Sequence, residues 1–183
     1  MKKEIEKLIG KPDKSFFGSP GILVWLFYGG GIPELDNKLK EEVIPKTLKL
    51  YTFLHKKGIY LQPESADTFR NRYRNIQVVI PYDRIINIRY KDKTGIETET
   101  KNKSVLGRAL IGGILLGPLG AAVGGMTGVG QKDVTKSDFL LIHYKKEDGE
   151  DGVIGLCGTR SEKTKIAIEK FINRYRKLST ASK

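Results

Sequence analysis

Residues 105–130, VLGRALIGGILLGPLGAAVGGMTGVG, constrain the fold of this chain more than any other stretch. They hold nine of its 21 glycines and one charged residue, Arg108. Each glycine in a helix costs about 0.5–1 kcal/mol relative to alanine, so an isolated helix here would be unstable and needs a packing partner. Small residues four positions apart share one helical face and let two helices approach closely. Those residues are Gly113 and Gly117 in the first half, and Gly120, Gly124 and Gly128 in the second.

Gly117 and Pro118 interrupt this segment in the middle, because proline breaks or kinks a helix. One unbroken helix would be about 39 Å long, but each half is only about 18 Å, which is too short for a bilayer core of about 30 Å. Strand-like patterns flank the segment at residues 85–100 and 139–156. If those strands share one sheet, the segment leaves and returns on the same side of it. We therefore predict an inserted helical hairpin over residues 101–133.

Three placements of this hairpin remain open from sequence. It packs on its own domain or on another subunit, it dips into one leaflet of a membrane, or it crosses the membrane. Three cations lie at its base, where they are either headgroup contacts or ordinary solvated charges: Lys101, Lys103 and Arg108. Sequence does not decide between these two roles.

The rest of the chain reads as short strands followed by one helix. Alternating or continuous apolar runs predict strands at residues 22–28, 48–54, 59–61, 76–80, 85–90, 96–100, 139–144 and 153–156. We expect Lys57-Gly58 to supply a left-handed position in a hairpin turn. A capping box at Thr159 to Glu162 predicts a final amphipathic helix ending near Leu178. The fold class is α+β: a curved antiparallel sheet or partial barrel, capped by the C-terminal helix.

A length of 183 residues suits one domain with an appendage. We assign residues 1–20 to an N-terminal helix and linker, 21–178 to the domain, and 179–183 to a disordered tail. The N-terminus is charged and lacks the apolar run of a signal peptide. The chain has a single cysteine, Cys157, so a reducing cytoplasm is the expected compartment.

The net charge of +12 draws the protein towards polyanions or acidic partners. The predicted anion contacts are Lys56 and Lys57 in the first hairpin turn, and Arg70, Arg72 and Arg74 further on. Phe69 and Tyr73 interleave with these arginines, which suits single-stranded nucleic acid as well as lipid phosphates. A solvated basic loop is the third reading of this stretch.

No catalytic constellation emerges from the sequence. His55 and His143 lack a carboxylate or second ligand at useful spacing, and residues 125–133 lack the lysine and hydroxyl residue of a phosphate-binding loop. The acidic run at residues 147–151 lacks the ligand pattern of a calcium loop. We expect no cofactor, no metal and no small-molecule substrate.

Taken in order, several motifs resemble those of bacterial PH-like domains, which are related to PH and GRAM modules. YGGGIPEL (residues 28–35) resembles a glycine-proline opening, LHKKGIYLQ (54–62) a hairpin, and VVIPYDRIINIRY (78–90) the next strand pair. Residues 138–178 resemble the closing strands and capping helix. The insert at 107–128 resembles a glycine-rich apolar insert found in this place in many members.

This resemblance implies a PH-like fold and a binding or adaptor module rather than an enzyme. We expect the glycine-zipper hairpin to mediate self-association or shallow attachment to an anionic membrane, aided by the basic turns. The expected location is cytoplasmic, with attachment at the inner face of the cell membrane. The alternative is a soluble nucleic-acid-binding protein that uses residues 69–75.

Overall fold

The computed structural model describes residues 2–13, 22–40, 48–63, 73, 76–92, 137–159 and 161–182. Three α-helices, a 3-10 helix and seven strands lie in these ranges. In chain order they are α1 (Lys2–Ile9), β1 (Ile22–Gly30), α2 (Pro33–Lys40), β2 (Lys49–Leu54), β3 (Gly58–Pro63), β4 (Val78–Pro81), η2 (Tyr82–Arg84), β5 (Ile85–Asp92), β6 (Ser137–Lys145), β7 (Asp151–Thr159) and α6 (Glu162–Ala181).

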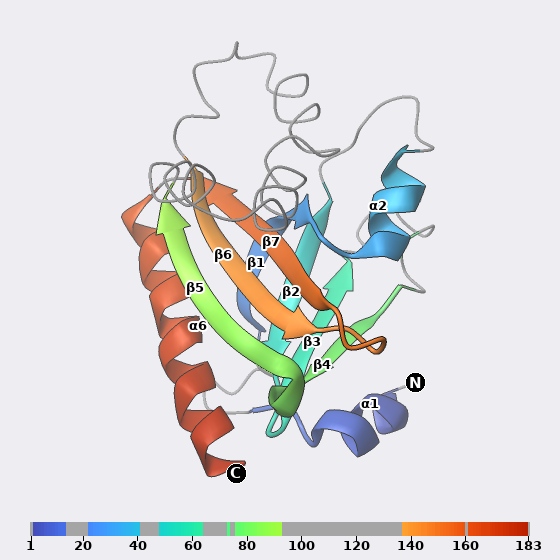
Figure 1. Cartoon of the computed structure of the whole chain (residues 1–183). Helices are drawn as coiled ribbons and strands as arrows, with labels where there is room; N and C mark the ends of the chain where they lie inside the picture. Colours follow the sequence, from blue (N-terminus) through green and yellow to red (C-terminus); the bar gives the residue numbers. More distant parts are fainter. Residues whose placement is uncertain are drawn as a thin grey trace.

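The strands form one antiparallel sheet in the order β4-β3-β2-β1-β7-β6-β5. The continuous apolar run of β1 lies at its centre, paired with β2 on one side and β7 on the other. β4 and β5 lie at opposite edges, yet only the three residues of η2 join them. The sheet must therefore curve until its two edges approach each other at η2. Figure 1 shows this curvature, with α6 alongside β5.

The hydrophobic core lies inside the curve of the sheet and beneath α6. β2 shows the alternation that produces it, with Leu50, Thr52 and Leu54 buried and the residues between them half-buried. Ile168, Phe171 and Ile172 of α6 belong to the same buried cluster. The predicted α+β class, the curved antiparallel sheet and the capping helix are confirmed. The expected strand at 96–100 and the hairpin at 101–133 lie outside the described residues.

Both ends of α6 differ from the prediction. Thr159 belongs to β7, and the N-cap is Ser161, whose Oγ accepts a hydrogen bond from the Thr164 amide at 3.1 Å. The N-cap thus lies two residues after Thr159, the cap that the capping box predicted. The helix continues to Ala181, three residues past the predicted boundary at 178, so residues 179–181 of the predicted tail 179–183 are helical.

The predicted helix near the N-terminus is confirmed as α1, which packs on the domain. Its Ile5 and Ile9 form a small apolar cluster with Tyr60 of β3. The chain then runs along the β2–β3 turn, where the amides of Lys56 and Lys57 donate to the carbonyls of Lys11 and Ile9 at 3.0 and 2.8 Å. An ion pair closes this end, with Arg174 of α6 donating two hydrogen bonds to Asp13 at 2.5 and 2.8 Å.

Two glycines are required for reasons that the sequence did not indicate. Gly58 does not take the left-handed conformation that we predicted for the turn. A Cβ there would lie 2.7 Å from the Ile80 carbonyl and would overlap the Ile9 side chain, so Gly58 allows close packing instead. Gly31 has a φ of +97°, and a Cβ there would overlap the Val153 carbonyl. Gly31, the residue after β1, thus lets the chain pass close to β7.

Candidate functional site

The two strands that flank the glycine-rich insert in the chain are neighbours in the sheet. β5 and β6 are antiparallel neighbours, and Asp92, the last residue of β5, pairs with Asp138 near the start of β6. Asp138 is buried, and its Oδ1 accepts a hydrogen bond from the Tyr90 hydroxyl at 2.8 Å. The flanking strands therefore share one sheet, as the sequence argument assumed, and their ends before and after the insert lie side by side.

Most of the predicted contact residues cannot be placed. The helix-packing glycines Gly113, Gly117, Gly120, Gly124 and Gly128, and the cations Arg70, Arg72, Arg74, Lys101, Lys103 and Arg108, all lie outside the described residues. Their roles stay predictions.

Tyr73 is described, and it is buried in the main core at 3% exposure. Its ring therefore cannot stack on a nucleic-acid base, and the nucleic-acid alternative loses one of its two aromatic residues.

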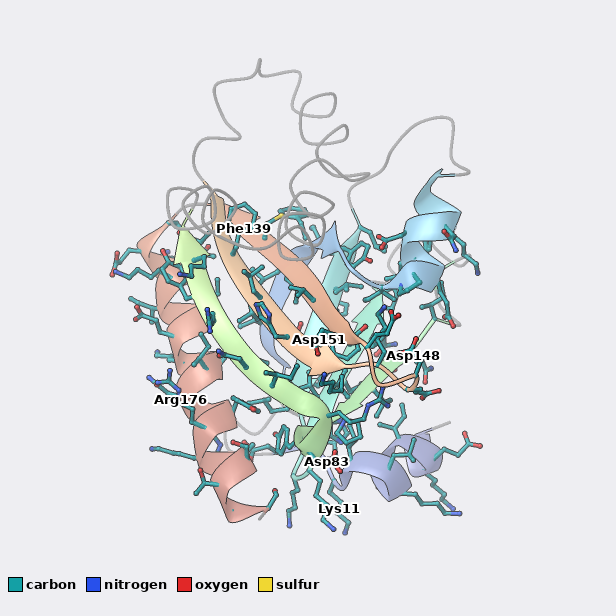
Figure 2. All side chains as sticks on the ribbon, viewed as in Figure 1. Lys11, Asp83, Phe139, Asp148, Asp151 and Arg176 are labelled. Atoms are coloured by element: carbon teal, nitrogen blue, oxygen red, sulfur yellow. The ribbon has the colours of Figure 1, made fainter. Side chains whose placement is uncertain are left out.

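The β2–β3 turn lies at the opposite end of β5 from Asp92. The Tyr82 amide donates to the Lys57 carbonyl at 2.9 Å, which places this turn against η2, just before β5 begins. The insert departs after β5 ends, eight residues later, or about 26 Å at 3.3 Å per residue. Figure 2 shows Lys11 and Asp83 at the lower end of the view and Phe139 of β6 at the upper end. The basic turn and the Asp92–Asp138 pair thus lie at opposite ends of β5.

We call the end formed by α1, the segment after it, the β2–β3 turn, η2 and the last turn of α6 the basic pole. Five of its lysines are exposed, namely Lys3, Lys7, Lys11, Lys56 and Lys57. Among the described residues, none of these five ammonium groups forms an ion pair. Only Lys56 and Lys57 were singled out from sequence, because their hairpin turn was visible there.

A depression of about 410 Å³ lies in the basic pole. It is lined by Tyr82 of η2 and Tyr175 of α6, whose rings meet edge to face with centroids 5.4 Å apart. Leu8 and Ile86 also line it, with 64% and 54% of their surface exposed. Sequence reasoning missed this depression, because it joins residues from opposite ends of the chain.

A second groove, of about 620 Å³, lies between β5 and α6. Arg89, Lys91 and Arg176 line it together with one carboxylate, Glu169. Figure 2 shows Arg176 on the outer side of α6. The groove is open and mostly polar, so it offers little apolar surface for an anchor.

The YGGGIPEL motif serves the fold. The Tyr28 hydroxyl donates to Asp36 Oδ1 at 2.8 Å and accepts a hydrogen bond from the Ile32 amide at 2.6 Å, while Asp36 Oδ2 accepts one from the Gly31 amide at 3.1 Å. Burial, followed by the charge of Asp36, raises the pKa of Tyr28 well above its ordinary value. A tyrosine that stays protonated and fully bonded holds the start of α2 and is unsuited to proton transfer.

Burial makes His55 and Cys157 unsuited to chemistry at neutral pH. His55 Nδ1 is hydrogen bonded to the Gly10 carbonyl at 2.7 Å, and burial lowers the pKa of its ring. Burial raises the pKa of Cys157 to about 12, so its thiolate is scarce at neutral pH. Within the part of the chain that the structure describes, no three His, Cys, Asp or Glu side chains gather as metal ligands. No described helix is both long and apolar enough to cross a membrane.

Comparison with known families agrees with the fold. Residues 46–143, just over half of the chain, match the family model for the glycine zipper containing PH domain. The chain belongs to this family. The match includes β2 to β5, most of β6 and the glycine-rich insert between β5 and β6. A search of curated proteins finds no match. PH-like families are in general binding modules rather than enzymes, and the fold has the sheet and capping helix of such a module.

Proposed function

We propose that this PH-like domain is a non-enzymatic binding or adaptor module that uses its glycine-rich insert for self-association or shallow membrane attachment. The pairing of Asp92 with Asp138 is the observation that carries the proposal. It brings together the two strand ends that precede and follow the insert in the chain, which supports an insert that starts and finishes at that end of the sheet.

The chemistry of the insert supports an intermolecular role. Its glycines recur at intervals of four, which suits close helix packing, and their intrinsic cost of about 0.5–1 kcal/mol each requires compensating contacts. A second copy of the hairpin or the boundary region of a leaflet supplies such contacts. Because both flanking strands pair in one sheet, an insert that enters lipid must leave on the same face.

The test compares the full chain with a variant in which a short Asn-Gly turn replaces residues 93–136. Such a turn fits between antiparallel neighbours, so the variant should retain cooperative thermal unfolding. We expect the full chain to form oligomers in sedimentation, or to float with anionic vesicles even at high salt. The variant should do neither. Equal sedimentation and equal flotation of the two proteins would contradict the proposal.

A point substitution sharpens this test. Gly124→Leu should weaken self-association or flotation, because a large side chain separates packed helices. Gly124→Ala is the matched control, since it keeps the residue small, and we expect a much weaker effect from it. If leucine and alanine behave alike, close packing through this face is not the cause.

A further inference from the structure

The basic pole carries exposed apolar side chains that the proposed function does not use. Three large apolar residues are exposed among the described ones, namely Leu8, Ile86 and Ile166. Leu8 of α1 and Ile86 of β5 line the same depression, although 77 positions separate them in the chain. Two exposed aliphatic residues beside one hollow are typical of a binding surface rather than of scattered surface apolar residues.

The depression is rigidly built. The Tyr82 hydroxyl donates to the His55 carbonyl at 2.6 Å, and the Tyr82 ring packs against Tyr175. On the other side, the Ser182 hydroxyl donates to the Lys56 carbonyl at 2.9 Å and so joins the end of α6 to the basic turn. A hollow of about 410 Å³ with aromatic walls lies within the usual range of ligand pockets, about 300–1,000 Å³. It has room for an aliphatic side chain from a partner.

The charge around the depression is positive. Lys57 lines it, and the other four exposed lysines of the pole lie on α1, on the segment after α1 and in the β2–β3 turn. The carboxylates of the pole are Asp83 in the lining, Glu4 and Glu6 on α1, and Asp13, which is paired with Arg174, so the five exposed lysines outnumber them. An apolar centre with a charged rim is the usual anatomy of a protein interface.

We propose that the basic pole docks an acidic protein segment, with one aliphatic side chain of that segment seated in the depression and its carboxylates paired with the lysines. Complementary charge speeds and orients such an encounter. The pole lies at the opposite end of β5 from Asp92, so it does not involve the strand ends that flank the insert.

Two other occupants fit less well. The acidic β6–β7 turn of a second copy, residues 146–150, contains no apolar residue and would leave the depression unfilled. Binding to a lipid surface would not use the depression, and the Asp83 carboxylate would then face the headgroup phosphates. The lipid occupant is a distinguishable outcome of the following test.

The test uses the full-length protein and a phage library of random 12-residue peptides. Peptides enriched on the wild type, after depletion on Ile86→Ser, are synthesised with a fluorescein label and titrated by anisotropy. We expect them to share an aliphatic residue flanked by carboxylates. Ile86→Ser and the double change Lys56→Gln with Lys57→Gln should each weaken binding about tenfold, a factor that corresponds to about 1.4 kcal/mol.

Matched controls lie on α6, away from the pole. Ile166→Ser removes another exposed aliphatic residue, and Lys163→Gln removes another exposed lysine. Both should bind the peptides as the wild type does. The variant without the insert should also bind them, so this proposal and the proposed function fail independently.

Four results would overturn the proposal. The first two are that no peptides are enriched, or that the enriched peptides lack the acidic and aliphatic pattern. The third is that the substitutions in the pole leave peptide binding unchanged, and the fourth is that no peptide is enriched while the protein floats with anionic vesicles and the same substitutions abolish this flotation. The last result would assign the pole to lipid.

Discussion

The β2–β3 and β6–β7 turns flank the same short helix η2, yet they are stabilised in different ways. The β2–β3 turn is held through its backbone by α1, by the segment after α1 and by Tyr82. The β6–β7 turn is held largely by itself. The Lys146 amide donates to the Glu150 carbonyl at 2.8 Å, and the Glu150 amide donates to Asp148 Oδ1 at 2.9 Å.

Their charges follow the same division. In the β6–β7 turn, Lys145 pairs with Asp151 at 2.6 Å and Lys146 with Glu150 at 3.0 Å. In the β2–β3 turn, Lys56 and Lys57 have no such partner among the described residues. A turn that satisfies its own charges offers little to a partner. A turn whose backbone is held by neighbouring segments keeps its charges available.

The largest expected effect comes from substituting one glycine beside each turn. Gly58→Ala would place a Cβ against the Ile80 carbonyl and the Ile9 side chain, and should lower the free energy of unfolding by about 2–3 kcal/mol. Gly149→Ala is the control, because nothing lies within 4 Å of its Cβ and only its φ of +84° is unfavourable. We expect about 1 kcal/mol there. Urea unfolding measures both, and equal losses would mean that α1 does not pack tightly on the basic turn.

The second prediction compares an ion pair on each side of η2. Asp13→Asn removes the charge that receives two hydrogen bonds from Arg174, with Asp13 only 11% exposed. We expect a loss of about 1 kcal/mol in the free energy of unfolding. Glu150→Gln removes a well-exposed partner of Lys146, and should cost less than about 0.5 kcal/mol.

Urea unfolding at low and high salt distinguishes the two pairs. Both losses should shrink as salt screens the charges, and the exposed pair should shrink more. If Glu150→Gln proves as costly as Asp13→Asn, then the acidic turn is not held mainly by its own backbone.

The sequence predicted the sheet well because its strands carry local signals. β2 alternates buried and half-buried residues, and β1 is a continuous apolar run, as expected of a central strand. Helix α2 was not predicted, because the three glycines and Pro33 indicate the end of the preceding strand rather than the start of a helix. Proline also fits the first turn of a helix, where its missing amide costs nothing.

The candidate site was less accessible to sequence analysis. Lys56 and Lys57 could be found because their hairpin is local. Leu8 and Ile86 each look like an ordinary apolar residue of an amphipathic element. Only the curvature of the sheet brings α1, η2 and the end of α6 together, and no local sequence pattern predicts that these elements lie side by side.

The smallest predicted effect concerns His55, which joins the basic turn to the segment after α1. Burial lowers the pKa of its ring below the ordinary value of 6.5, while the hydrogen bond to the Gly10 carbonyl and the charge of Glu6 oppose this shift. The folded protein therefore binds fewer protons at His55 than the unfolded chain does. The stabilisation is complete above about pH 6.5 and is lost as the pH falls from there through the folded pKa.

The effect should be small because a protonated imidazole still donates to the Gly10 carbonyl, so protonation adds only the cost of burying a charge. His55→Asn provides a side-chain amide that can donate to the same carbonyl and does not titrate. We expect the free energy of unfolding to fall more for the wild type than for this variant between about pH 7.5 and 5.5. Parallel profiles would show that burial does not lower the pKa of His55. The contact of the N-terminal segment with the basic turn would then be looser than the 2.7 Å bond indicates.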